Sequence, residues 1–120
     1  MKTVKVVIGG CRYYNNYQDF CEFTDKCLSE DRNKAITILS GHCSGADMMA
    51  ERYAKENGYE LQVFPAQWNK YGRAAGPIRN KQMVELADKV IAFWDYKSAG
   101  TKTLIQYAKE ENKHIDIMKI

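Results

Sequence analysis

The chain has 120 residues, of which 45% are hydrophobic and 28% are charged, and its formal net charge is +3 at pH 7. This length allows one domain with a single core, and the composition is that of an ordinary soluble globular protein. No apolar stretch approaches the roughly 18 residues of a membrane span, and a charge this small and dispersed does not by itself indicate a nucleic-acid surface. We therefore expect one domain over residues 1–120, and a small anionic ligand fits the charge equally well.

The start of the chain and its cysteines favour a reducing compartment. The Met-Lys-Thr start leads directly into a strand pattern rather than a signal-peptide core, so we expect a cytoplasmic protein. The four cysteines, at positions 11, 21, 27 and 43, form neither a CxxC pair nor a zinc-type spacing. We therefore expect reduced thiols and no metal site, while the reactivity of Cys11 and Cys43 stays open.

Apolar, β-branched runs alternate with helical patterns along the chain. The expected strands are residues 4–8, 35–39, 60–64, 89–94 and 114–118. The expected helices are residues 17–29, 45–57, 77–87 and 101–112. This alternation predicts a three-layer α/β fold with a five-stranded, mainly parallel sheet covered by helices on both faces.

Three loops follow the carboxyl ends of expected strands and carry small residues before a helix. Gly9 and Gly10 follow the first strand, residues 40–47 follow the second, and Gly100 and Thr101 follow the fourth. A helix that starts there directs free backbone N–H groups and the positive end of its dipole toward the loop, which favours a phosphate or carboxylate. Open parallel sheets bind ligands at this edge, so we expect the three loops to form a ligand site.

Two common nucleotide-binding motifs are absent from these loops. Residues 9–14 read Gly-Gly-Cys-Arg-Tyr-Tyr and have only the opening glycines of the G-x-G-x-x-G fingerprint. Residues 100–103 read Gly-Thr-Lys-Thr, but no glycine lies five residues before them. The sequence therefore disfavours a Rossmann dehydrogenase and a Walker-type nucleotidase.

Two arginines and one carboxylate are candidates for direct ligand contact. Arg12 and Arg79 could each hold a phosphate or carboxylate with two hydrogen bonds, or could form surface ion pairs. Asp47, in the first turn of its helix, could bind a ribose hydroxyl, take part in catalysis, or only complement the helix dipole. The further candidates for ligand binding are Gly9, Gly10, Ser40, Gly41, Ser44, Gly45, Asn80, Gly100 and Thr101. The hydroxyl groups among them could equally cap helices.

A long connection at residues 65–76 carries aromatic and basic side chains. Connections of this length in compact domains are often functional, although this one could also be a surface lid without a role. Trp68 and Tyr71 in this connection, and Trp94 at the end of the fourth strand, could stack on a base or could be packing side chains. His42 has no visible partner in the sequence and is assigned no chemical role.

Taken together, these motifs resemble the YspA-like branch of the SLOG superfamily. The resemblance rests on residues 40–47, on Gly-Pro-Ile-Arg-Asn at 76–80, and on residues 86–93 followed by the Gly-Thr step at 100–101. It covers nearly the whole chain in order and implies a Rossmann-like domain whose ligands are nucleotides or nucleotide-derived molecules. Relatives in the superfamily include the LOG phosphoribohydrolases, which release a base from a nucleoside monophosphate, sensor domains that bind signals made from NAD, and the DNA-processing protein DprA.

The resemblance to the LOG enzymes is incomplete at the residues that carry their chemistry. These enzymes have an Arg-Lys pair before the fourth strand; Arg79 matches the arginine, but Asn80 replaces the lysine. Their Gly-Thr step is matched at residues 100–101, but their glutamate position is Leu104 here. Cleavage of an N-glycosidic bond needs a carboxylate, so binding is better supported than catalysis.

The sequence leaves three functions open. The leading hypothesis is a sensor or sequestering protein that binds a nucleotide or nucleotide-derived small molecule at the carboxyl edge of the sheet. The second is a nucleoside 5'-monophosphate N-glycosidase in which Asp47 or Asp95 replaces the missing glutamate. The third and least favoured is a DprA-like nucleic-acid-handling module, whose binding would weaken steeply with salt. We also expect a homodimer or larger homo-oligomer, no membrane contact and no bound cofactor.

Overall fold

The computed structural model describes residues 2–120 as an α/β fold with two short 3-10 turns, Ser29–Asp31 and Gly72–Ala74. The strands are β1 (Thr3–Gly10), β2 (Ala35–Ser40), β3 (Glu60–Val63), β4 (Lys89–Trp94) and β5 (His114–Lys119). The helices are α1 (Tyr17–Cys27), α2 (Ala46–Asn57), α3 (Trp68–Tyr71), α4 (Ala75–Leu86) and α5 (Ala99–Glu110). The expected alternation of strands and helices is confirmed.

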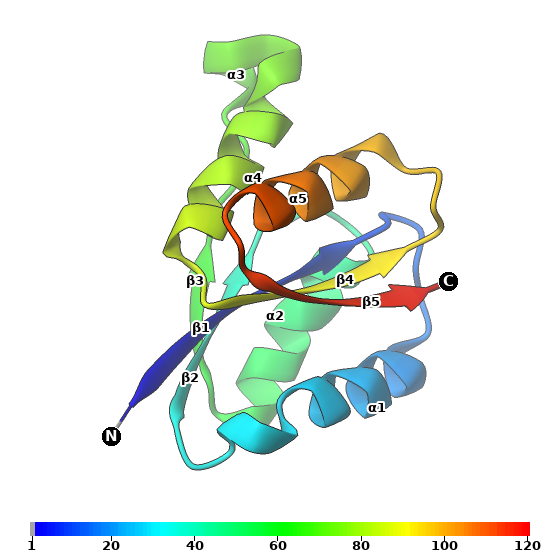
Figure 1. The fold of residues 1–120 in the computed structure, drawn as a ribbon. Helices are drawn as coiled ribbons and strands as arrows, with labels where there is room; N and C mark the ends of the chain where they lie inside the picture. Colours follow the sequence, from blue (N-terminus) through cyan, green and yellow to red (C-terminus); the bar gives the residue numbers. More distant parts are fainter. Residues whose placement is uncertain (1) are drawn as a thin grey trace.

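The sheet has five strands in the order β3-β2-β1-β4-β5, and each neighbouring pair is parallel. Helices α1 and α2 cover one face, and α4 and α5 cover the other (Figure 1). The chain winds outward from β1 to β3 and then crosses to β4, so the winding direction changes between β1 and β4. In open parallel sheets this is the position where a ligand-binding crevice forms.

The central strand supplies side chains to both faces of the sheet. Val6 and Ile8 of β1 are fully buried and pack in the same cluster as Phe20 of α1. Val7, between them, is equally buried but packs with Val84 on the α4 face. Because both faces are covered, the strand is apolar almost throughout rather than alternating with polar residues.

The connection at residues 65–76, expected to be a loop, is largely helical. Helix α3 occupies Trp68–Tyr71 and a 3-10 turn follows before α4 begins at Ala75. Gly72 ends α3 with a left-handed φ of 57°, which glycine adopts at little cost. Figure 1 shows α3 projecting beyond the sheet, and none of its residues is buried. The polar residues and glycines of this connection predicted a loop. The short helix α3 has no buried residue and so left no apolar pattern in the sequence.

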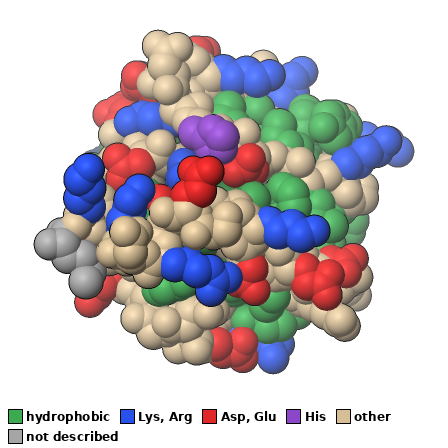
Figure 2. Space-filling view, turned by 60° about the horizontal axis from the view of Figure 1, so that its bottom comes forward, with side chains coloured by type: hydrophobic (Ala, Val, Ile, Leu, Met, Phe, Trp, Pro, Cys, Tyr) green, Lys and Arg blue, Asp and Glu red, His purple; other side chains and the backbone are tan. Residues whose placement is uncertain are grey.

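The surface mixes charges of both signs. On the face shown in Figure 2, lysines and arginines lie among aspartates and glutamates rather than gathering in one stripe. Among residues 2–120, no helix is both long enough and apolar enough to cross a membrane.

Candidate ligand-binding site

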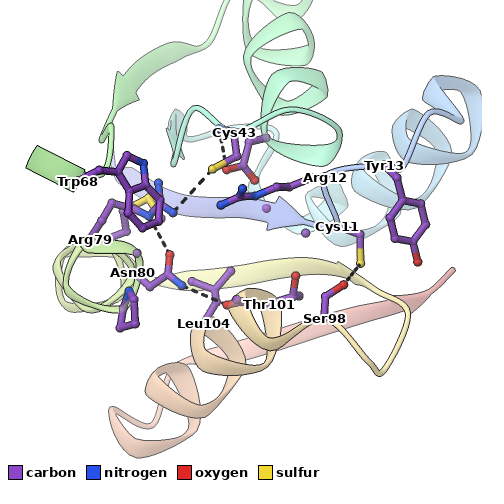
Figure 3. Close-up of a pocket in the computed structure, with 17 residues that line it drawn as sticks. Cys11, Arg12, Tyr13, Cys43, Trp68, Arg79, Asn80, Ser98, Thr101 and Leu104 are labelled. Carbon is purple, nitrogen blue, oxygen red and sulfur yellow. Dashed lines mark hydrogen bonds between the residues drawn. The ribbon is translucent and has the colours of Figure 1, made fainter. Parts of the chain in front are cut away.

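A cavity of about 320 Å³ lies at the carboxyl ends of the strands, where the winding direction changes. The structure brings nine of the candidate residues to its wall: Gly9, Gly10, Arg12, Asp47, Trp68, Arg79, Asn80, Gly100 and Thr101. They come from the end of β1 and the loop after it, from the start of α2, from α3 and α4, and from the first turn of α5, and Figure 3 shows the labelled ones around one space. The other candidate residues do not line it: Ser40, Gly41, Ser44, Gly45, Tyr71, Trp94 and Asp95.

The carboxyl group of Asp47 is buried in the cavity wall. Its Oδ2 accepts a hydrogen bond from the backbone N–H of Cys43 at 3.2 Å. A Cβ at Gly9 would lie 3.0 Å from Oδ1, so glycine there leaves room for the carboxyl group. Burial raises the pKa of Asp47 to about 6, although the N–H groups of Cys43 and Gly10 and the charge of Arg79 act in the opposite direction. A carboxyl group that titrates near neutral pH can bind a donor or transfer a proton.

Arg79 is only 7% exposed, and its guanidinium group connects several segments at the cavity wall. Its Nη1 donates to the carbonyl oxygens of Gly41 and Phe64, at the ends of β2 and β3. Its Nε donates to Asn80 Oδ1 at 2.9 Å, while Nη2 has only the thiol of Cys43, at 3.8 Å. A sulfur is a weak acceptor, so Nη2 is the part of the guanidinium with donor capacity left for a ligand.

The first turn of α5 is open toward the cavity. No side chain caps this helix, and its first turn contains no acidic residue. Within residues 2–120 the backbone N–H groups of Ala99, Gly100 and Thr101 have no hydrogen-bond acceptor. A Cβ at Gly100 would meet no other part of the chain within 4 Å, so packing does not require glycine at this position. Free N–H groups together with the helix dipole favour an anion here.

The first turn of α2, in contrast, is closed. Gly45 precedes it with φ 76°, and a Cβ there would lie 2.3 Å from the carbonyl oxygen of Cys11. The N–H of Ala46 donates to that same oxygen at 3.2 Å. The carboxyl group of Asp47 also lies in this turn, where it opposes a second anion. Between the N-termini of α2 and α5, that of α5 is therefore the better position for a phosphate.

Ser40 belongs to a hydrogen-bond network behind the cavity. Its hydroxyl donates to Glu51 Oε2 at 2.9 Å and accepts from the N–H of His42 at 3.1 Å. His42, whose φ is 63°, places Nδ1 2.8 Å from the same oxygen of Glu51. Sequence reasoning missed Glu51, although it lies one helical turn after Asp47 on α2 and so faces the same side. The network gives His42 the partner that the sequence did not show.

Asp95 shapes the loop after β4. Its carboxylate accepts hydrogen bonds from Tyr13 Oη at 2.6 Å and from the N–H groups of Lys97 at 2.8 Å and Ser98 at 2.7 Å. These donors, Tyr13 first, hold the pKa of Asp95 well below its usual range. An ionised carboxylate with both oxygens engaged and no place in the wall is less suited to acid–base chemistry than Asp47.

Of the three candidate aromatic residues, only Trp68 reaches the cavity. It is 48% exposed, and a Cβ at Gly76 would lie 3.4 Å from its ring. Tyr71, on the same short helix, does not line the cavity. Trp94 donates its indole N–H to the carbonyl oxygen of Ser98 at 3.0 Å, outside the wall. Stacking on a base is therefore available to Trp68 alone among the three.

Arg12 is exposed at the mouth of the cavity. Figure 3 shows its side chain extending from the loop after β1 over the space, toward Cys43. Within residues 2–120 it forms no ion pair within 4.0 Å. With Arg79 it gives the wall two positive groups against the single carboxyl group of Asp47, so an anionic ligand is favoured.

The wall also contains residues that sequence reasoning did not assign to the ligand. These are Cys11, Tyr13, Cys43, Gly76, Pro77, Met83, Ser98 and Leu104. Cys11 Sγ lies 3.2 Å from Ser98 Oγ, which joins the loops after β1 and β4. Most of them could have been assigned from their place in the sequence, because they neighbour assigned residues in the same loops and helices.

The parallel sheet with helices on both faces places the chain in the class of Rossmann-like α/β domains, and its cavity lies where open sheets of this class have their binding crevice. The sequence model of the YspA, cpYpsA-related SLOG family matches residues 4–71, more than half of the chain, and the chain belongs to this family. It is similar to the Gene 61 protein of Mycobacterium phage D29, with 31% identity over 81 residues. That alignment covers 62% of this chain and 65% of the phage protein. No solved structure gave a significant match.

Proposed function

We propose that this protein binds a nucleotide or a nucleotide-derived small molecule in the cavity, with a phosphate at the first turn of α5. The observation that carries the proposal is the uncapped start of α5 at Gly100, where the fold has no packing need for glycine. Glycine is a poorer helix former than alanine, by up to about 1 kcal/mol in a helix interior, so close approach of a ligand to the backbone would account for a glycine in this first turn that packing does not require. Membership of the SLOG family is consistent with a nucleotide-related function.

The dimensions and charges of the cavity favour a mononucleotide over a dinucleotide. A volume of about 320 Å³ is near the lower end of ligand pockets, which span roughly 300–1,000 Å³. Of the N-termini of α2 and α5, only that of α5 is open to an anion, because Asp47 and the packing of Gly45 close that of α2. The proposed arrangement has the phosphate at α5, a ribose hydroxyl near Asp47, and the base against Trp68.

A second candidate function, N-glycosidic cleavage, is supported by the position of Asp47. A Cβ at Gly9 would lie 3.0 Å from Asp47 Oδ1 and 3.5 Å from Leu104 Cδ2, so the two side chains lie beside the same point. Leu104 stands where the LOG motif has glutamate. Asp47 therefore places a carboxyl group close to the side chain of Leu104, which occupies the glutamate position of the LOG motif. With a pKa near 6, it can stabilise positive charge when ionised or donate a proton when neutral.

One incubation series distinguishes binding from cleavage. Purified protein is mixed with AMP, GMP, CMP, UMP, ADP-ribose and NAD, and affinity is measured by calorimetry while the mixtures are chromatographed over time. We expect at least one monophosphate to bind more tightly than NAD. Absence of binding by all six compounds would contradict the proposal.

Release of free base in the same series would establish the second function. Turnover should then be lost in Asp47→Asn and retained in Asp95→Asn, because only Asp47 faces the cavity. Base release that persists in Asp47→Asn would refute the role given to this carboxyl group. A nucleotide recovered intact after binding would leave binding as the function for that ligand.

A further inference from the structure

Asn80 joins the two parts of the wall that attract an anion. It is 6% exposed and lies on α4 directly after Arg79. Its Oδ1 accepts from Arg79 Nε at 2.9 Å, and its Nδ2 donates to the carbonyl oxygen of Gly100 at 3.1 Å. Figure 3 shows these bonds running from Arg79 through Asn80 to the start of α5. One side chain thus connects the guanidinium to the open helix N-terminus.

The orientation of the Asn80 amide follows from its partners. Arginine has only donors, so the atom that faces Arg79 Nε must be the oxygen. The NH2 group then faces Gly100 and meets a carbonyl oxygen, which can only accept. Both partners therefore require the same orientation of the amide. The bond to Arg79 is unusual within a helix, because the side chains of successive residues do not normally face each other. The side chain is therefore held in a defined position with both polar atoms engaged within the protein.

We propose that Asn80 is a positioning residue that makes the cavity select phosphorylated ligands over their unphosphorylated counterparts. The inference rests on the proposed function, because it assigns the phosphate to the first turn of α5. Asn80 orients Arg79 through Nε, which leaves Nη2 directed at the ligand, and it fixes the peptide group of Gly100, whose neighbouring N–H groups face the phosphate. The amide adds no charge, so selection depends on the alignment of these two elements.

Inorganic phosphate is the probe for this inference. It is titrated into the 15N-labelled protein, and the affinity is taken from the shifts of the Ala99, Gly100 and Thr101 amide signals. Asn80→Ala removes both bonds and should weaken phosphate binding about tenfold, the effect of losing one hydrogen bond to a charged group. Asn80→Asp, which is nearly isosteric, keeps an acceptor for Arg79 but cannot donate to Gly100 and adds a negative charge. It should weaken binding at least as much.

The matched control is Gln82→Ala on the exposed side of the same helix, which should bind phosphate as the wild type does. AMP and adenosine are then compared in each variant, with thermal melting to confirm folding. A positioning role lowers the affinity for AMP and leaves that for adenosine unchanged. A general structural defect would lower both, and that result would overturn the inference.

The remaining outcomes separate this inference from the proposed function. If phosphate shifts residues 99–101 equally in the wild type and both Asn80 variants, Asn80 has no positioning role while the phosphate position stands. If phosphate leaves these signals unchanged in the wild type, both are overturned. Combining Asn80→Ala with Arg79→Lys gives a further check: if Asn80 acts through Arg79, the two losses should be less than additive.

Discussion

Asp47 lies in the cavity wall, where burial makes the ionised form of its carboxyl group unfavourable. It is 7% exposed, and its wall position leaves it without an ion-pair partner within 4.0 Å among residues 2–120. A buried carboxyl group without such a partner resists ionisation, and perturbed groups of this kind gather at functional sites. The nearby charge of Glu51 acts in the same direction as burial.

Replacing Asp47 should therefore stabilise the protein at neutral pH. The pKa of Asp47 is about 6 in the folded state, above the value of about 3.9 for an unfolded chain, so the folded state holds the proton more tightly. Stability that depends on this proton is complete below about pH 4 and is lost as the pH rises through 6. Relative to Asp47→Asn, the wild type should lose up to about 3 kcal/mol in total from below pH 4 to above pH 7.

Urea denaturation of both proteins from pH 4 to pH 8 provides the measurement. The difference between their free energies of unfolding should change with pH and level off above about pH 7. Asp95→Asn serves as a comparison, because the low pKa of Asp95 moves its dependence to a more acidic range. Parallel curves for the wild type and Asp47→Asn would show that Asp47 titrates as an ordinary exposed carboxylate.

The sequence correctly predicted cavity residues mainly where they follow the carboxyl ends of strands. Gly9, Arg12 and Thr101 follow predicted strands, and parallel strands bring their carboxyl ends together, so these residues reach the cavity wall. Ser40 and Asp95 occupy equally suitable positions in the sequence but face protein partners instead. Their partners, Glu51 and Tyr13, are distant in the sequence, and no local pattern reveals such a hydrogen bond.

Two glycines near the cavity, at residues 41 and 100, differ in the space around them. At α5, Gly100 has space around it, whereas Gly41, in the loop before α2, has none. A Cβ at Gly41 would lie 2.6 Å from Arg79 Nη1 and 2.9 Å from Asp47 Oδ2. Glycine is therefore needed for packing at residue 41 but not at residue 100, where the proposed function gives it the role of ligand access.

Alanine at these two positions should consequently have opposite effects on stability. Gly100→Ala should stabilise the protein by about 0.5–1 kcal/mol, because alanine is the better helix former and meets no neighbour. Gly41→Ala should destabilise it by about 1–3 kcal/mol, the cost of overpacking. Chemical denaturation measures both effects, and phosphate titration should show weaker binding in Gly100→Ala despite its higher stability. Unchanged phosphate affinity in Gly100→Ala would contradict the proposal that glycine at residue 100 lets a phosphate approach the backbone.

Element prediction succeeded where hydrophobic periodicity was strong and failed where packing was absent. All five strands and the four long helices were found. β1, β2 and β4 are buried along most of their length, whereas β3 and β5, at the edges of the sheet, are apolar in pattern but have no buried residue. Helix α3 has only four residues, Trp68–Tyr71, and none is buried, so no repeating apolar face exists to be recognised. A segment of this length forms through its local hydrogen bonds and its caps, which sequence patterns specify poorly.

The cavity is assembled from two stretches of the chain. The family match at residues 4–71 spans β1 to α3 and supplies Gly9, Asp47 and Trp68. Arg79, Asn80 and the start of α5 lie beyond the matched region, so the proposed phosphate position belongs to the other stretch. The family assignment and the proposed phosphate position therefore rest on different residues. The expected homo-oligomer stays a prediction.

A fragment that ends at residue 71 should not fold on its own. In the intact sheet β1 lies between β2 and β4, and Val7 packs against residues of α4 and α5. Removal of β4, β5 and both helices would expose one edge of β1 and its face toward α4. Circular dichroism and amide proton spectra of this fragment should show a largely unfolded chain, with the full-length chain as the control. A cooperative unfolding transition in the fragment would contradict the prediction.

The strand order also sets when the central pairing can form. β1 is synthesised first, yet its neighbour β4 is among the last elements to be made, and Lys5 of β1 donates to Asp88 at a sequence separation of 83. Closing so long a loop costs entropy before any contact compensates for it, and topologies rich in distant pairings fold more slowly. During synthesis β1 therefore lacks one of its two neighbouring strands until β4 has been made, and the cavity exists only once nearly the whole chain has emerged.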